Sequence, residues 1–141
     1  MINKQKLIAV IILLNTGFLV AQQADDLLGT YRLSNDLEIE IFKAGDQYNG
    51  KIVALNGYKN GETRDVNNPD KTKRNDLLIG KVIIEGLEFD EQDKEWIDAT
   101  IYGPEKGMLA NLRVTEVDDN EIKVVASKYF FWRTLKWKKT E

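Results

Sequence analysis

Apolar and polar side chains alternate along most of this chain, which is the pattern of half-buried β-strands. Between residues 36 and 43, Leu37, Ile39 and Ile41 fall on one face while Glu38 and Glu40 fall on the other. Turn-forming segments rich in Gly, Asn and Asp separate such runs. The pattern predicts eight strands, near residues 28–33, 36–43, 47–55, 77–89, 94–102, 108–117, 121–127 and 130–138.

Eight consecutive strands joined mostly by tight turns predict an all-β fold, an eight-stranded antiparallel up-and-down barrel. Closing the meander removes its exposed edges, and a barrel of eight strands encloses either packed side chains or one small ligand. A two-sheet sandwich is the alternative. The run 77–89 contains Gly80 and Gly86, which predicts a bend or bulge. We expect one barrel domain over residues 22–141, with 56–75 as a long surface loop.

The first 21 residues have the layout of a secretory signal peptide. Lys4 and Lys6 precede the unbroken apolar run 7–14, and a second apolar patch ends at Ala21. We predict cleavage between Ala21 and Gln22 and a location in the bacterial periplasm or outside the cell. A retained membrane anchor is the alternative. The apolar run is shorter than the ~20 residues of a spanning helix, so we expect no stable membrane span after cleavage.

Composition narrows the possible functions. The 141 residues include neither cysteine nor histidine, and the net charge is -3. A Cys/His zinc site, a Ser-His-Asp triad and a disulfide framework are therefore excluded. A mildly acidic chain is also poorly suited to binding nucleic-acid phosphates. We expect no enzyme activity, no cofactor, no metal and no nucleic-acid partner.

The last predicted strand raises the question of a buried arginine. Phe131, Arg133, Leu135 and Trp137 share one face. If this face points inward, Arg133 enters the barrel, where it needs a carboxylate, carbonyls or an aromatic face. Asp98 is a candidate partner. Anion binding and a surface position are the alternatives for this arginine.

Strand 94–102 has two possible inward faces. One is aliphatic, and the other carries Trp96, Asp98, Thr100 and Tyr102. Burial of the aliphatic face would turn Asp98 outward, whereas aromatic bodies with a few polar tips suit a ligand pocket. The candidate ligand-binding residues are Trp96, Asp98, Tyr102, Arg133 and Trp137.

The long loop carries a superficial calcium-loop spacing. Asp65, Asn67 and Asp76 stand at the first, third and twelfth positions. However, Pro69 supplies no side-chain oxygen at the fifth position, and Asp70 stands where the tight-turn glycine belongs. The spacing therefore does not predict a metal site.

A rigid turn explains the same loop better. Pro69 fixes its own φ and pushes Asn68 into an extended conformation, while Asp65 and Asp70 can accept backbone N–H bonds. Arg74 could pair with either carboxylate. The functional alternative is a lid over the barrel mouth.

The aromatic run 129–132 alternates between faces, so some of its side chains are expected to point outward. An exposed Phe130 and Trp132 would suggest a partner surface or a homodimer.

The loop residues also carry a family resemblance. Asp65-Val66-Asn67-Asn68-Pro69-Asp70, then Arg74 and Leu77-Leu78-Ile79-Gly80, resemble the D-x-x-N-P-D…R…L-x-G core of the bacterial domain of unknown function 2147. Further matches are Gly29-Thr30-Tyr31, Tyr48-Asn49-Gly50-Lys51-Ile52-Val53, Gly86-Leu87-Glu88-Phe89-Asp90, Trp96, Ile101-Tyr102, Pro104, Gly107, Arg133-Thr134 and Trp137.

The resemblance implies an exported, lipocalin-like (calycin) barrel without supplying an activity. In calycins an arginine near the end of the last strand packs over an aromatic residue of the first strand, which implies that Tyr31 contacts Arg133. The chain departs from the family pattern at Ala99, Gly103, Ala110, 125–127 and Trp132. If those positions line a site in the family, the site is altered here.

Two functions are favoured, and an enzyme that uses Asp98, Arg133 or the Asp65/Asp70 loop is a third option. The first is a non-catalytic barrel that binds a small apolar ligand in its interior. The second is a packed barrel that acts through its surface as a protein-interaction or envelope-stress module. Large residues such as Tyr48, Trp96, Phe131 and Trp137 would favour the second function if they filled the interior together.

Overall fold

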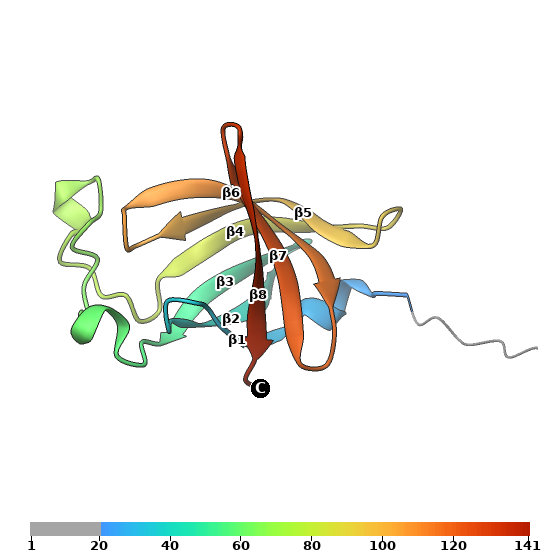
Figure 1. The fold of residues 1–141 in the computed structure, drawn as a ribbon, viewed down its shortest axis with the longest axis horizontal. Helices are drawn as coiled ribbons and strands as arrows, with labels where there is room; N and C mark the ends of the chain where they lie inside the picture. Colours follow the sequence, from blue (N-terminus) through green and yellow to red (C-terminus); the bar gives the residue numbers. More distant parts are fainter. Residues whose placement is uncertain (1–20) are drawn as a thin grey trace, which may run out of the picture.

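The computed structural model describes residues 21–141, which form a closed barrel of eight antiparallel strands in chain order (Figure 1). The predicted barrel is confirmed, and the predicted signal peptide, residues 1–21, lies outside the described residues except for Ala21. The strands are β1 (Gly29–Arg32), β2 (Glu38–Ala44), β3 (Gln47–Ala54), β4 (Val82–Asp90), β5 (Glu95–Gly103), β6 (Met108–Val117), β7 (Glu121–Lys128) and β8 (Phe131–Lys139). Within residues 21–141, no helix is both long and apolar enough to cross a membrane.

The barrel closes through a short pairing between its first and last strands. Tyr31 lies opposite Lys139, and Arg32 lies opposite Lys138. Just beyond this pairing, the backbone N–H of Thr140 donates to the carbonyl of Thr30 over 2.8 Å. Because the ladder closes on itself, neither β1 nor β8 presents a free edge along these residues.

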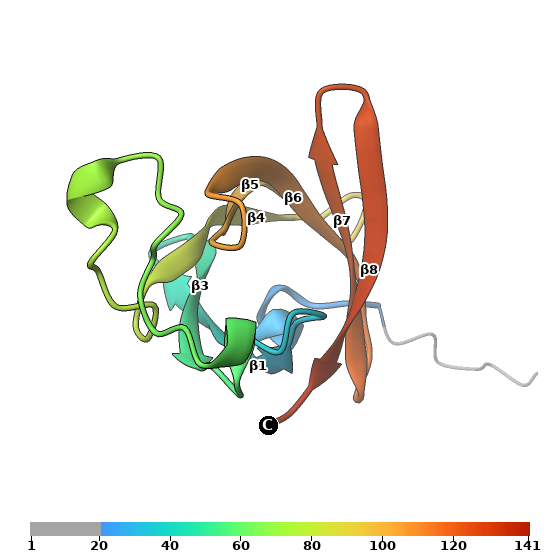
Figure 2. The ribbon, with the colours of Figure 1, turned by 60° about the vertical axis from the view of Figure 1, so that its left-hand side comes forward.

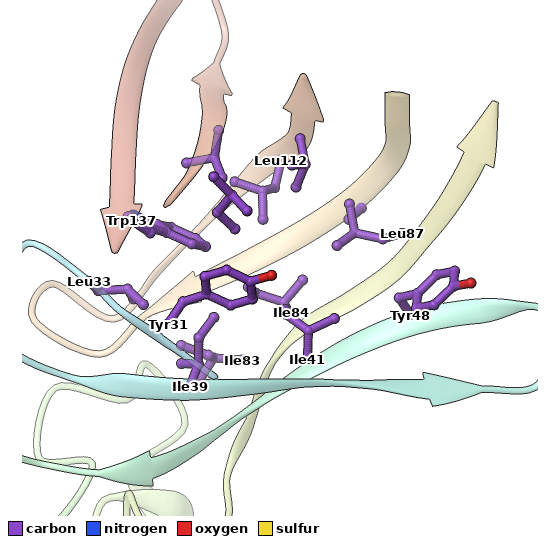
Figure 3. Packing of buried hydrophobic residues seen from close by; sticks show 14 of the residues in the cluster. Tyr31, Leu33, Ile39, Ile41, Tyr48, Ile83, Ile84, Leu87, Leu112 and Trp137 are labelled. Atoms are coloured by element: carbon purple, nitrogen blue, oxygen red, sulfur yellow. The ribbon is translucent and has the colours of Figure 1, made fainter. Parts of the chain in front are cut away.

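Apolar side chains from all eight strands fill the interior, among them Tyr31, Ile84 and Leu87 (Figure 3). One end is closed by the 3₁₀ turn η1 (Ala24–Leu27), whose Leu27 is fully buried. The indole of Trp96 donates to the carbonyl of Ala24 over 2.9 Å. The hydroxyl of Tyr31 donates to the carbonyl of Leu27 over 2.8 Å. These two bonds satisfy the polar tips of the aromatic side chains and hold η1 in place.

Strand β4 starts later than the alternation predicts and contains the expected irregularity. Residues 77–81 form a turn in which Gly80 adopts a φ of 84° and donates its N–H to Ile52, so the strand begins only at Val82. At Gly86, φ is 86° and the pairing with β3 shifts register. The side chain of Asn49 accepts the Gly86 N–H over 3.0 Å, which satisfies the donor at this bulge.

A second bulge changes which residues of β5 point inward. Trp96 pairs with Val114 but Ala99 pairs with Leu112, so β5 carries one extra residue between them, where Asp98 has a φ of 66°. Trp96 and Ala99 are consequently both buried although they are three residues apart, and Asp98 is exposed. The prediction of one uninterrupted inward face on this strand is wrong for either face.

The last strand also differs from the prediction. Arg133 and Phe131 are exposed, because the end of the β7–β8 hairpin projects beyond the barrel (Figure 2). Arg133 pairs with Ala126, six residues before the Lys139 that lies beside Tyr31. At ~3.3 Å per residue, about 20 Å separates the two positions. The predicted inward Arg133, with its contact to Tyr31, is therefore wrong.

We expect the fold to be lost in alkali because buried tyrosines resist ionisation. Burial raises the pKa of Tyr31, Tyr48 and Tyr58 to about 12, and burial together with a hydrogen bond from its hydroxyl to Asp65 raises the pKa of Tyr102. Each raised pKa means that the folded chain holds the proton more tightly than the unfolded chain, whose tyrosines titrate near ~10. This stabilisation is complete below pH ~10 and decreases as the pH rises toward ~12.

Circular dichroism and phenolate absorbance, followed together from neutral to alkaline pH, check this expectation. Loss of the β-sheet signal should accompany ionisation of these tyrosines. A β-sheet signal that persists after all tyrosines have ionised would contradict it.

Candidate functional site

The structure brings together only two of the five predicted ligand-binding residues. Tyr102 and Trp137 line one cavity at the barrel end opposite η1. Trp96 lies at the η1 end, bonded to Ala24, and Asp98 faces outward at its bulge. Arg133 is exposed on the projecting hairpin, and no ion pair to Asp98 forms among the described residues.

The cavity has a volume of about 140 Å³. It lies between the β1–β2 turn, the start of β4, the end of β5 and the segment of β8 that contains Leu135 and Trp137. Its lining is mainly apolar. The apolar lining includes Leu33, Leu37, Ile83, Ile101, Leu135 and Trp137.

Trp137, which lines this cavity, carries an unused hydrogen-bond donor. The residue is 2% exposed, and its indole nitrogen is buried without a hydrogen-bond partner among the residues that the structure describes. An indole N–H can only donate, and leaving such a group unpaired costs about 1–3 kcal/mol. A molecule in the cavity with an acceptor atom could satisfy this donor.

A buried carboxylate lies next to the cavity. Asp65 is 1% exposed and accepts two hydrogen bonds of 2.8 Å, from the Tyr102 hydroxyl and the Asn68 amide. The ammonium group of Lys81 lies 3.3 Å from the same carboxylate. These three donors surround Asp65, which compensates for the loss of water around its charge. The carboxylate in turn fixes the Tyr102 ring at the cavity wall.

Asp65 and Asn68 are among the predicted loop residues, but the partners of Asp65 differ from the prediction. Its carboxylate was expected to accept hydrogen bonds from backbone N–H groups, whereas it contacts the side chains of Tyr102, Asn68 and Lys81. No signal in the sequence distinguishes Asp65 from the other charged residues of this loop, because Tyr102 and Lys81 lie outside it. No group of three metal-binding side chains occurs within residues 21–141.

The rest of the loop is a rigid turn, with one predicted contact replaced. Asp70 accepts hydrogen bonds from the Thr72 hydroxyl over 2.7 Å and from the Thr72 backbone N–H over 3.0 Å, and these lower the pKa of its carboxyl group. Arg74 donates to the carbonyl of Asn68 over 2.8 Å rather than to a carboxylate, so the predicted ion pair is not formed.

The loop packs closely on the β5–β6 turn. The Asn67 amide donates to the carbonyl of Glu105 over 3.0 Å, and Gly107 lies beneath Asn67 with a φ of 62°. A Cβ atom at Gly107 would lie 1.9 Å from the backbone oxygen of Asn67. Glycine at this position therefore permits both the backbone conformation and the close approach.

Comparisons with known proteins agree with this fold. A family model described as "Uncharacterized protein conserved in bacteria (DUF2147)" matches residues 29–139. The chain is also similar to a solved structure, HP1028 from Helicobacter pylori, which is described as belonging to the lipocalin family. The TM-score is 0.69 at 18% identity, with 82% of this chain and 83% of that chain covered. No curated protein matches.

The buried and exposed aspartates of the loop should differ sharply in their effect on stability. We expect Asp65→Asn to lower the free energy of unfolding by about 3 kcal/mol, since it leaves Lys81 without its buried partner. Asp70→Asn is the matched control. It should cost less than about 1 kcal/mol, because the residue is exposed and asparagine also caps a turn. Urea unfolding measures both, and equal losses would contradict the proposed role of Asp65.

A pair of glycine variants isolates the contact between loop and turn. Gly107→Ala should destabilise the fold by about 1–3 kcal/mol more than Gly45→Ala. Both glycines have a similar φ, 62° and 64°, but nothing lies within 4 Å of a Cβ at Gly45. Hydrogen exchange should also show faster exchange at 65–70 in the Gly107 variant alone. Equal behaviour of the two variants would show that the close approach contributes nothing.

Proposed function

Since this chain belongs to the bacterial DUF2147 family and shares its fold with a lipocalin-family protein, we propose that it is an exported, non-catalytic barrel that binds one small, largely apolar molecule. The observation that carries the proposal is the apolar cavity with the unpaired indole N–H of Trp137. Eight-stranded barrels are wide enough to hold one small ligand.

The cavity volume limits the size of the ligand. A volume of about 140 Å³ is close to the ~150 Å³ of an engineered apolar cavity that binds benzene. It lies below the ~300 Å³ at which pockets for drug-sized molecules begin. The rest of the interior is occupied by large side chains, among them Tyr31 and Trp96. The ligand proposed is therefore about the size of one substituted ring.

The polar groups around the cavity limit its chemistry. No charged side chain lines the cavity, so a charged ligand would lose its water without gaining an ionic partner. The Tyr102 hydroxyl already donates to Asp65. Ser34 and Asn35 also line the cavity, at exposed and half-buried positions, so Trp137 carries its buried donor, which favours a neutral molecule with one acceptor, such as a carbonyl.

Export and lack of catalysis rest on the sequence. Lys4, Lys6 and the apolar run that follows support a signal peptide, and hence a location in the periplasm or outside the cell. The chain has no histidine or cysteine to act as base or nucleophile.

The second candidate function is a packed barrel that acts through its surface as an interaction or envelope-stress module. The filled interior around Tyr31, Tyr48 and Trp96 favours it. Whether a small molecule binds in the cavity distinguishes between the two candidate functions.

We expect acetophenone, which carries one carbonyl acceptor, to shift the indole N–H resonance of Trp137 in a nitrogen–proton correlation spectrum. α-Methylstyrene has nearly the same shape without the acceptor, and it should bind about fivefold more weakly, the equivalent of one neutral hydrogen bond. In Trp137→Phe this difference between the two probes should disappear, because the donor is gone.

Two further measurements make the outcome decisive. Leu135→Phe should fill part of the cavity and weaken both probes, whereas Leu109→Phe, at an exposed position outside the cavity, should weaken neither. Native mass spectrometry of protein from its own host should show an added small mass. An empty host protein, together with no shift for either probe at millimolar concentration, would overturn the proposal.

A further inference from the structure

The tip of the β7–β8 hairpin exposes four consecutive aromatic side chains. Tyr129, Phe130, Phe131 and Trp132 are between 76% and 91% exposed. Unlike an isolated surface leucine, such a contiguous apolar patch normally marks a contact with another surface. None of the four lines the ligand cavity, so the tip is independent of the proposed ligand site.

The tip is narrow and convex. Ladder pairing continues to Lys128 and Phe131, so the two strands stay together to the end of the hairpin, which projects away from the barrel (Figures 1 and 2). Tyr129 adopts a φ of 54° in the turn. The exposed aromatic side chains at this tip can therefore reach a surface that the barrel wall does not contact.

Two cations flank the aromatic tip. Residues 122–140 contain six Lys or Arg residues and no Asp or Glu. Of these, Lys138 and Lys139 lie beside β1 at the far end of the strand, and Lys123 and Lys136 pair with Glu116 and Glu121. Lys128 and Arg133 flank the four aromatic residues directly, and neither forms an ion pair within residues 21–141. The Lys128 ammonium group donates to the carbonyl of Leu109 over 2.9 Å, a bond that leaves its charge uncompensated.

We propose that this hairpin tip binds the surface of a lipid bilayer that contains anionic lipids. Tryptophan and tyrosine favour the interface between headgroups and acyl chains, where the ring is apolar and the polar tip stays wet. Lys128 and Arg133 would then lie at the level of the lipid phosphates, where each cation near an anionic surface contributes about 1 kcal/mol. The aromatic side chains would insert between the lipid headgroups, and the two cations would favour anionic headgroups.

A second copy of the chain is a poorer occupant. Pairing of two identical tips would bring Lys128 and Arg133 of one copy close to the same residues of the other, and the like charges would repel. The homodimer predicted from the exposed aromatic residues is therefore the competing outcome of the test.

Flotation with vesicles tests the proposal. The full mature chain should float with phosphatidylcholine vesicles that contain phosphatidylglycerol, and much less with phosphatidylcholine alone. Phe130→Ser with Trp132→Ser should weaken binding at least tenfold. The matched control is Leu77→Ser with Ile79→Ser, which removes two other exposed apolar side chains and should bind as the parent does.

The contribution of the two cations and the insertion of the aromatic side chains are tested separately. Lys128→Gln with Arg133→Gln should reduce the preference for phosphatidylglycerol, whereas Lys71→Gln with Lys106→Gln, also at exposed positions, should not. Trp132 is the exposed tryptophan, since Trp96 and Trp137 are buried. Brominated acyl chains should therefore quench Trp132 on binding, and this quenching should be absent in Trp132→Phe.

Three outcomes would overturn the proposal. The parent chain fails to bind the anionic vesicles, or the variant with Phe130 and Trp132 replaced binds as well as the parent. In the third, the parent self-associates without lipid and that variant does not, which would identify the tip as a dimer surface. Circular dichroism of each variant shows that a lost signal does not come from unfolding.

Discussion

The fold depends on the pairing of its first and last strands. β1 has four residues, and its ladder with β8 aligns Tyr31 with Lys139 and Arg32 with Lys138. Without this pairing the meander would have two free edges and the apolar cluster an open side. The burial of Tyr31 and Trp137, on the two joined strands, adds apolar contact to these few backbone bonds. Closure and core formation therefore support each other.

At the barrel end opposite η1, the structure of the long loop depends on the buried carboxylate of Asp65 rather than on apolar packing. Asp65 fixes Tyr102 beside the cavity and holds Asn68, so the long loop keeps a defined shape against the β5–β6 turn. Removing a carboxylate from water is costly, and the Lys81 ammonium group with two hydrogen bonds compensates for that cost. The indole N–H of Trp137, which also lines this cavity, has no hydrogen-bond partner within residues 21–141.

Strand alternation predicted the eight-stranded meander and favoured its closure into a barrel over a two-sheet sandwich, but it did not predict the details. Period two and turn residues located all eight strands, since both follow directly from backbone geometry. The bulge at Asp98 had no such signal, because an aspartate rather than a glycine adopts the positive φ. For Arg133, alternation could not tell where the barrel wall ends and the projecting hairpin begins. The burial of Asp65 depends on Tyr102 and Lys81, which are distant in sequence from each other and come together only in the fold.

Strand β8 carries the cavity residue Trp137 and the exposed Trp132 on one continuous stretch of backbone. Neighbouring side chains on a strand point to opposite faces, so adding or deleting a single residue between them would exchange the faces of everything that follows unless a bulge absorbed the change, as at Asp98. The indole of Trp137 would then face solvent and a lysine would face the core. Evolution can therefore lengthen or shorten this hairpin most easily at its turn and by pairs of residues, one on each strand, while the segment from Leu135 to Lys139 has a fixed length.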